Sequence, residues 1–357
     1  MSHQEILARI EKDLRNRNSD DTRKRAAEQL RELVQVTARD YPQERFLEFY
    51  AGVNNKVAHL VQNASEPSER LGGIHALDAL IDFDGVDAAQ KTTRFTQSLR
   101  KVFLTKDLVA MQPAAVALGK LCRPGGALIA ELVESEVKTA LEWLQSDRIE
   151  EKRYAAVLIL RELSRNAPTL MYTFVGLIFD QIWVGLRDTR LLIRATAAEA
   201  ISACFQIIRE RDQMMRQQWQ TKIYDEAVQG VRQGTVEYVH GSLLVIKELL
   251  QQGGMFMHEH YQEVCDIVFR HKDHRDMTIR RTVVILIPEL ADYSPSEFAQ
   301  TYLHKFMIFL SGMLKKDKDR NDAFVAIGKI ANAVKSAIAP YLDGVLIYVR
   351  EGLSIKS

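Results

Sequence analysis

The residues best suited to metal chemistry gather in the last third of the chain. Two histidine pairs with HxH and HxxH spacing stand there with one cysteine and one aspartate: His258, His260, Cys265, Asp266, His271 and His274. Such spacing can supply zinc ligands, but it matches neither the HExxH helix of zinc hydrolases nor the paired cysteines of structural zinc sites. We expect a polar helix end followed by a loop, with a zinc site as the alternative.

Phosphate-binding and catalytic motifs are missing from the sequence. It has no GxGxxG and no GxxxxGK followed by Ser or Thr, and Gly328-Lys329-Ile330 lacks the distal glycine and the hydroxyl group. The run Asp82-Phe83-Asp84-Gly85 resembles a kinase metal-binding tripeptide, but it has an extra Asp and no HRD-type loop accompanies it. We therefore predict a turn at 82–85, no catalytic residue and no cofactor or metal site.

The charge balance argues against nucleic acid as a partner. Lys plus Arg total 48 and Asp plus Glu total 47, so no strong positive field attracts polyanions. Three cysteines lie far apart without a CxxC pair, which suits a reducing compartment. The N-terminus lacks the pattern of a signal peptide, and the most apolar stretch, 173–186, is too short to span a bilayer. These features predict a cytoplasmic protein.

One pattern recurs eight times and predicts the fold. A small residue is followed by large apolar residues four and seven positions later, beginning with Ala26/Leu30/Leu33 and ending with Ala323/Ile327/Ile330. The spacing follows one stripe of a helix, and a period of about 40 to 47 residues is typical of two-helix HEAT or armadillo units. We predict an all-α HEAT-repeat α-solenoid of about eight two-helix units plus a terminal helix, formed as a single solenoid over residues 1–357.

Each unit is expected to open with a first helix and to close with a second helix that carries the small residue. The N-terminal residues also predict a helix. Aspartates in the turns within units are expected to cap the helices that follow them: Asp20, Asp21, Asp107, Asp147, Asp188 and Asp319. The expected first helices span 42–62, 89–104, 127–145, 169–186, 213–232, 256–271 and 296–314, with a terminal helix at 340–353. The expected second helices span 20–38, 67–81, 108–122, 149–165, 190–209, 236–251, 276–291 and 319–337.

Two kinds of residue are expected to hold the repeats together. Small residues let neighbouring helices approach closely; among them are Gly73, Ala114, Ala156 and Ala197. Arginines stand three positions before the small residue in six units: Arg23, Arg70, Arg153, Arg194, Arg280 and Arg320. We predict that these arginines reach a turn aspartate or a carbonyl of the neighbouring repeat and form a ladder between units. A stripe that binds phosphate or nucleic acid is the alternative.

Three less repetitive runs carry a family resemblance. ERLGGIHAL at 69–77, EVKTALEWL at 136–144 and RYAAVLILREL at 153–163 resemble the N-terminal HEAT region of target-of-rapamycin (TOR) kinases, which belong to the phosphatidylinositol-kinase-related serine/threonine kinases. The runs occur in the family's order. The resemblance implies a segment of a larger kinase whose catalytic domain, with its ATP and magnesium, lies elsewhere, so we expect no kinase activity in this chain.

The resemblance also implies partners and a location. In that family the region is a scaffold for a dimeric complex with the Raptor-like subunit of TOR complex 1, within a kinase that controls growth in response to nutrients. In animal members it also helps to receive an activating small GTPase, and the residues that match the family around this contact are Phe49, Tyr50 and Asn54. Peripheral recruitment to the lysosomal or vacuolar membrane is implied as well.

Two other functions use the same repeats. A phosphatase scaffold or transport receptor is the closer alternative, and the TOR-like runs argue against it. A HEAT-like DNA glycosylase would use tryptophans and the arginine column, but the balanced charge opposes strong binding to DNA.

Overall fold

The computed structural model describes residues 3–146, 148–209 and 213–354, and within these ranges it contains helices and connecting segments but no strand. The fold is the predicted all-α solenoid. The chain divides into two compact units, Met1–Gly185 and Leu186–Ser357. The expectation of a single solenoid over residues 1–357 stays a prediction, and each unit is considered by itself.

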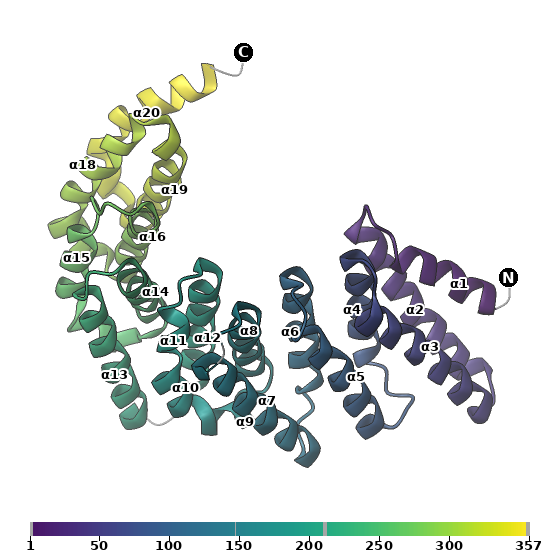
Figure 1. The fold of residues 1–357 in the computed structure, drawn as a ribbon. Helices are drawn as coiled ribbons and strands as arrows, with labels where there is room; N and C mark the ends of the chain where they lie inside the picture. Colours follow the sequence, from purple (N-terminus) through teal and green to yellow (C-terminus); the bar gives the residue numbers. More distant parts are fainter. Residues whose placement is uncertain (1–2, 147, 210–212, 355–357) are drawn as a thin grey trace. The chain divides into compact units, whose positions relative to one another are not determined.

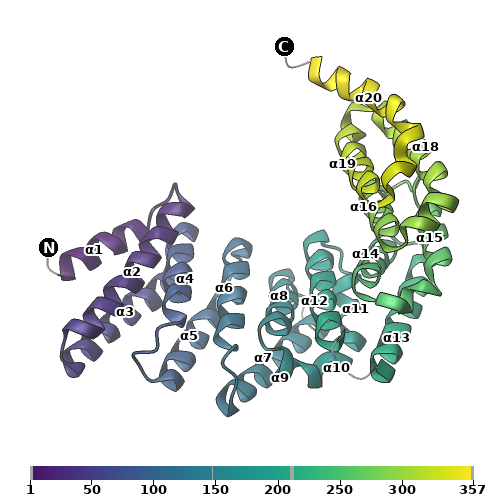
Figure 2. The same cartoon turned by 180° about the vertical axis from the view of Figure 1, so that it is seen from behind.

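The first unit is built from helix pairs (Figure 1). Its helices are α1 (His3–Leu14), α2 (Asp20–Asp40), α3 (Gln43–Asn63), α4 (Pro67–Ile81), α5 (Ala88–Val102), α6 (Leu108–Leu121), α7 (Ala127–Ser146), α8 (Glu150–Asn166), α9 (Pro168–Met171), η1 (Tyr172–Phe174), α10 (Val175–Gln181) and α11 (Trp183–Leu186). The second helices α2, α4, α6 and α8 pack one on the next, and each contacts the first helix that precedes it in the chain (Figure 2).

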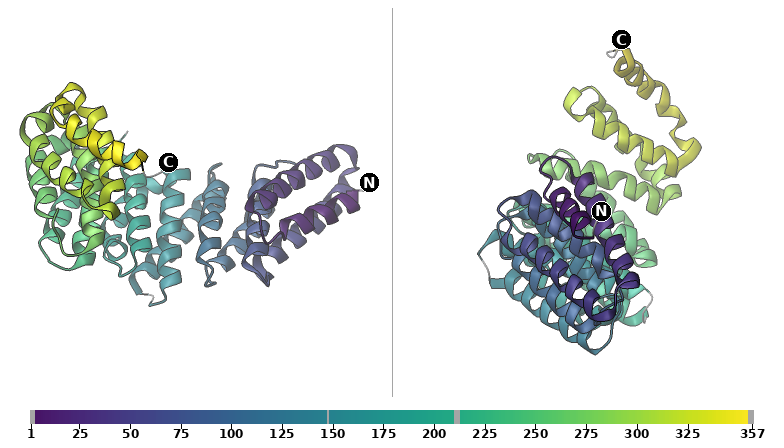
Figure 3. Two further views of the ribbon diagram at one scale, coloured as in Figure 1. Left: turned by 90° about the horizontal axis from the view of Figure 1, so that it is seen from above. Right: turned by 90° about the vertical axis from the view of Figure 1, so that its right-hand side faces the viewer.

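The second unit repeats this plan (Figure 3). Its helices are α12 (Leu191–Arg209), α13 (Gln213–Val231), α14 (Val236–Gln252), η2 (Gly254–His258), α15 (Tyr261–Arg270), α16 (Met277–Tyr293), α17 (Pro295–Glu297), η3 (Phe298–Tyr302), α18 (Leu303–Leu314), α19 (Asp317–Val334), η4 (Lys335–Ile338) and α20 (Ala339–Ser354). The second helices α12, α14, α16 and α19 again pack in sequence.

Polar residues fix several helix starts, though not always those predicted. Asp107 accepts a hydrogen bond from Ala110 N and caps α6 as expected. Ser19, rather than Asp20, caps α2 by accepting from Thr22 N. Asp319 was expected to cap a helix, but α19 begins two residues earlier, at Asp317. Asp147, also expected to be a cap, lies outside the described residues.

The structure divides three of the predicted first helices. The segment 169–186 becomes α9, η1, α10 and α11. The segment 256–271 becomes the end of η2 followed by α15. Gly254 has a φ of 56°, a left-handed conformation that a continuing helix does not allow. The segment 296–314 contains a π-helical turn at Phe298–Tyr302, where one wider turn interrupts the α-helical bonding. Apolar periodicity predicts that a segment is helical, but not such local changes of pitch.

Two helical stretches have the length and hydropathy of a membrane span, Leu191–Arg209 and Asp317–Glu351. The first is mostly buried inside its unit and serves as a core helix. The second is interrupted at Lys335, whose φ is 55°.

Candidate functional site

The region predicted to contact a partner contains a surface groove between two first helices. Two adjoining cavities of about 540 and about 280 Å³ lie between α3 and α5 and share Asn54 and Arg94. The segment 84–87, between α4 and α5, closes one end of the larger cavity. We call these two cavities the α3–α5 groove.

Two of the three predicted contact residues line this groove. Tyr50 and Asn54 are 6% and 8% exposed and face the larger cavity, whereas Phe49 is half-buried and lines neither cavity. The Tyr50 ring packs against Phe46 and Phe83, with ring centroids 5.9 and 5.8 Å away. This packing fixes the phenol at the floor of the groove.

The floor of the groove has unsatisfied polar atoms. Tyr50 Oη and Asn54 Oδ1 are buried, and neither has a partner with hydrogen-bond geometry among the described residues. Burial raises the pKa of Tyr50, while the neighbouring Asn54 side chain and the charge of Arg94 oppose the shift. An unmade hydrogen bond of a buried group costs roughly 1–3 kcal/mol, and a small rearrangement on binding would let a partner offset this cost.

The wall formed by α5 is basic. Arg94 is exposed, lines both cavities and makes no ion pair within the described ranges. Lys91 is buried, and its Nζ donates to Ile81 O and Phe83 O, each at 2.6 Å. Burial lowers the pKa of Lys91, while Asp84 and Asp82 oppose that shift. Lys91 therefore holds the end of α4 in place, and Arg94 is the cation available to a partner.

The turn predicted at 82–85 falls in a non-helical connector at 82–87, between α4 and α5. Asp87 caps α5 by accepting from Gln90 N at 2.7 Å. A side chain at Gly85 would overlap the Phe83 ring, because a Cβ there would lie 2.3 Å from the ring. The segment thus shapes one end of the groove.

Sequence reasoning missed the contribution of α5. Lys91 and Arg94 follow Tyr50 and Asn54 by about one repeat period, so the repeat itself was the available signal. Residues at equivalent repeat positions on successive first helices lie side by side, and this spacing places the two cations beside the two predicted residues.

The predicted small residues are buried, and Gly73 lies at a close helix contact. Gly73 is buried in α4, and a Cβ there would lie 2.7 Å from Leu60 Cβ and 2.9 Å from Val61 N in α3. The other three are fully buried: Ala114 in α6, Ala156 in α8 and Ala197 in α12.

The arginine column differs from the expected ladder. In all six units the guanidinium donates to a main-chain carbonyl in the last turn of the first helix of its own pair or in the connector that follows that helix: Arg23 to Asn16, Arg70 to Val61, Arg153 to Arg148, Arg194 to Asp188, Arg280 to His274 and Arg320 to Leu314. The last carbonyls of a helix and those of a connector lack intrahelical donors. The arginines therefore tie each hairpin together.

Two arginines also reach the next pair. Arg70 forms an ion pair with Asp107, the capping residue of α6, at 2.9 Å. Arg194 Nε donates to His240 Nδ1 in α14 at 2.9 Å. These contacts couple successive repeats within each unit.

The histidine-rich stretch serves the packing of the second unit. The His260 ring stacks on Tyr224 with centroids 4.0 Å apart, and His271 Nδ1 lies 2.7 Å from Ile267 O. Cys265 is fully buried, and burial raises its pKa to about 12. Among the described residues no group of three or more His, Cys, Asp or Glu side chains is placed to hold a metal.

Comparison with known proteins gives clear relatives, although no protein-family model matches the chain. Serine/threonine-protein kinase tor1 of Schizosaccharomyces pombe is 41% identical over 344 residues, which cover 96% of this chain and 15% of the relative. Serine/threonine-protein kinase TOR of Oryza sativa is 37% identical, covering 91% of this chain and 13% of the relative. Serine/threonine-protein kinase TOR2 of Saccharomyces cerevisiae is 35% identical, covering 92% of this chain and 14% of the relative.

Solved structures with similar folds include importin beta and Kap121p. Importin beta gives a TM-score of 0.60 at 13% identity, covering 95% of this chain and 42% of that chain. Kap121p bound to Ste12p gives a TM-score of 0.55 at 11% identity, covering 99% of this chain and 36% of that chain. At such low identity these similarities establish the helical-repeat fold alone.

The relatives decide between the families that share this fold. The chain spans about 15% of the length of the curated relatives that it matches. It has none of the kinase motifs, so it does not correspond to their kinase domain. Identity of 35–41% over more than nine-tenths of the chain shows that it belongs to the target-of-rapamycin serine/threonine kinases, as an N-terminal HEAT-repeat segment.

Proposed function

We propose that this chain is the non-catalytic scaffold region of a TOR-type kinase that controls growth in response to nutrients. Its role is to offer helical-repeat surface for complex assembly and for regulatory partners. The kinship with TOR kinases and the solenoid fold support this role. ATP and magnesium belong to the kinase domain of the whole protein, and the scaffold itself takes no cofactor.

The proposed partners are proteins. A Raptor-like subunit of TOR complex 1 binds the scaffold within a dimeric assembly, and nucleic acid is not a partner. An activating small GTPase docks at the α3–α5 groove. The whole kinase is cytoplasmic, with peripheral recruitment to the lysosomal or vacuolar membrane.

The groove is the observation that carries the GTPase proposal. It combines buried, unpaired polar atoms of Tyr50 and Asn54 with the free cation of Arg94. A partner with an acidic side chain and hydrogen-bonding groups would satisfy both features, which are typical of a protein interface rather than of a catalytic cleft.

Binding of purified partners to the full-length kinase tests this proposal. We expect Arg94→Glu to weaken binding of the GTP-loaded GTPase by at least about tenfold, as loss of an interface anchor does, and to leave the Raptor-like subunit bound. Arg25→Glu, at an exposed position of α2 outside the groove, is the matched control. Equal GTPase binding by both variants would refute the docking site.

A second measurement tests the scaffold role itself. A pull-down from cytosolic extract with this chain should recover the Raptor-like subunit, identified by mass spectrometry. Recovery of importin cargo or phosphatase subunits instead would overturn the assignment.

A further inference from the structure

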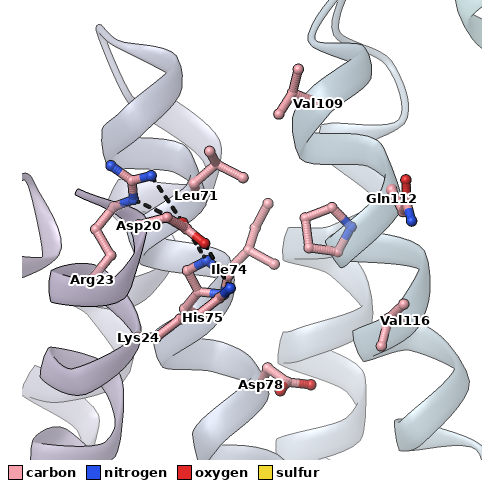
Figure 4. Close-up of a pocket in the computed structure, with 11 residues that line it drawn as sticks. Asp20, Arg23, Lys24, Leu71, Ile74, His75, Asp78, Val109, Gln112 and Val116 are labelled. Atoms are coloured by element: carbon pink, nitrogen blue, oxygen red, sulfur yellow. Dashed lines mark hydrogen bonds and ion pairs between the residues drawn. The ribbon is translucent and has the colours of Figure 1, made fainter. Parts of the chain in front are cut away.

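A second groove lies on the second helices of the first unit, away from the α3–α5 groove. It encloses about 580 Å³ between α2, α4 and α6, and it shares no lining residue with the α3–α5 groove. Figure 4 shows its side chains, with those of α2 and α4 facing those of α6. We call it the α2–α6 groove.

The middle of this groove is apolar. Leu71 and Ile74 line it from α4, and Val109, Pro113 and Val116 line it from α6. Val109 is 69% exposed, so an aliphatic side chain is left open to water at the groove mouth. A ligand side chain inserted there would gain roughly 25 cal/mol for each Å² of apolar surface removed from water.

The same groove contains hydrogen-bond acceptors without the usual donors. Pro113 lies inside α6 and has no N–H, so the Val109 carbonyl lacks its i+4 helical partner. Asp78 Oδ2 accepts from Lys120 at 2.6 Å, but its buried Oδ1 has no hydrogen-bond partner within the described ranges. A helical ligand has few N–H groups to offer because its own carbonyls use them. An extended chain has many, so these acceptors favour an extended ligand.

The rim of the groove on α2 has two cations around one carboxylate. Asp20 accepts hydrogen bonds from Arg23 at 2.9 Å and pairs with Lys24 at 2.8 Å, and His75 Nε2 lies 3.0 Å away. Partial burial alone would raise the pKa of Asp20, but the hydrogen bonds from Lys24, His75 and Arg23 outweigh it and hold the pKa well below the usual range. Two permanent cations thus surround one carboxylate, and Lys24 is the exposed one.

The second unit has a groove at equivalent repeat positions. A cavity of about 300 Å³ between α16 and α19 is lined on α16 by Arg281, Val284, Ile285 and Pro288. Counted from the repeat position of Val283 in α16 and of Gly73 in α4, these residues stand at the same positions as Leu71, Ile74, His75 and Asp78 of α4. An interior proline again lies in the lining, and Val325 on the facing helix is 57% exposed. Each unit therefore has a groove between second helices, although its proline lies on α6 in the first unit and on α16 in the second.

We infer that the α2–α6 groove binds an extended peptide segment of a partner protein. An aliphatic side chain of the segment enters between α4 and α6, its main-chain N–H groups face the Val109 carbonyl and Asp78, and an acidic side chain meets Lys24. This peptide site would be one way in which the proposed scaffold holds a partner. It rests on the proposed function only because it requires that the partner is a protein.

Fluorescence anisotropy with synthetic probes tests the inference without any kinase subunit, so its outcome is independent of the GTPase and Raptor-like proposals. The probe is a fluorescein-labelled octapeptide of alternating Asp and Leu. The protein is the whole chain with Val325→Glu, which blocks the equivalent groove of the second unit. We expect saturable binding that Val109→Glu weakens at least about tenfold, as loss of an apolar interface contact does.

The matched control is Leu104→Glu, because Leu104 is 62% exposed but lies outside the groove. This variant should bind like the parent. A probe with Ala in place of Leu, a probe with Lys in place of Asp and a probe with N-methylated main-chain amides should each bind at least about tenfold more weakly.

Four results would overturn the inference: no saturable binding, equal effects of Val109→Glu and Leu104→Glu, tight binding of the N-methylated probe, or equal binding of the Lys probe. A concentration-dependent dimer in sedimentation that Val109→Glu abolishes would assign the groove to a second copy instead.

Discussion

At the scale of single residues, His240 is a buried histidine that must stay neutral. Its Nδ1 accepts a hydrogen bond from Arg194 Nε at 2.9 Å. Burial, and then the charge of Arg194, lower its pKa to about 4, although Asp276 acts in the opposite direction. Protonation would place a second positive charge against the guanidinium and remove the acceptor. The sequence did not mark this residue, because only the packing of α12 on α14 brings the two side chains together.

We predict that this pair makes the second unit sensitive to acid. The unfolded chain binds a proton at His240 near pH 6.5, whereas the folded chain resists protonation until about pH 4. The contribution of neutral His240 to the free energy of unfolding is therefore complete above about pH 6.5 and is lost as the pH falls toward 4. Between pH 7 and pH 5 the loss amounts to about 2 kcal/mol. Urea midpoints at the two pH values measure it.

His240→Gln should reduce the difference between those midpoints, because glutamine does not titrate. His304→Gln changes an exposed histidine of α18 and should keep the full difference. An unchanged pH dependence in His240→Gln would exclude this histidine as the cause.

At the scale of helices, the small residue of the repeat sets how closely a pair can pack. Gly73 lets α4 approach the main chain of α3. The larger apolar residues Leu77 and Leu80 of the same stripe are fully buried beside that contact. The spacing in the sequence thus predicted which face of each second helix is buried, whereas the π-helical turn at 298–302 and the short helices of 168–186 had no such signal.

We predict that Gly73→Ala destabilises the chain by about 1–3 kcal/mol, as overpacking of a close helix contact does. Helix propensity alone would make alanine stabilising at this position. A decrease in the free energy of unfolding would therefore show that the added methyl group overpacks the contact between α4 and α3. The control is Gly52→Ala in α3, where an added Cβ meets nothing within 4 Å. Chemical denaturation should show a gain or no change for this control. A stabilised Gly73→Ala would contradict the register of α3 and α4.

At the scale of the whole chain, stability is built from neighbouring contacts. Within each unit, second helices pack on the neighbouring second helices, and the arginines bind mostly within their own hairpin. In such arrays a local substitution changes the stability of its own repeat and of the adjacent repeats more than that of distant ones. The binding grooves follow the same rule, since each is made from consecutive helices of one unit.

Hydrogen exchange followed by mass spectrometry tests this locality. We expect Gly73→Ala to speed amide exchange in α3 and α4, to affect α2 and α6 less, and to leave α16, α18 and α19 unchanged. Uniformly faster exchange across both units would show a single cooperative structure and refute the prediction.

The sequence by itself determined the fold class, the helix pairs, the buried stripe and the family resemblance, because apolar periodicity and the runs at 69–77, 136–144 and 153–163 are local properties of the chain. Only the tertiary structure decided that the arginines bind their own hairpins, that Arg94 joins Tyr50 and Asn54, and that α2, α4 and α6 form a groove. These features depend on which side chains of different helices meet, and that follows from the packing of successive repeats.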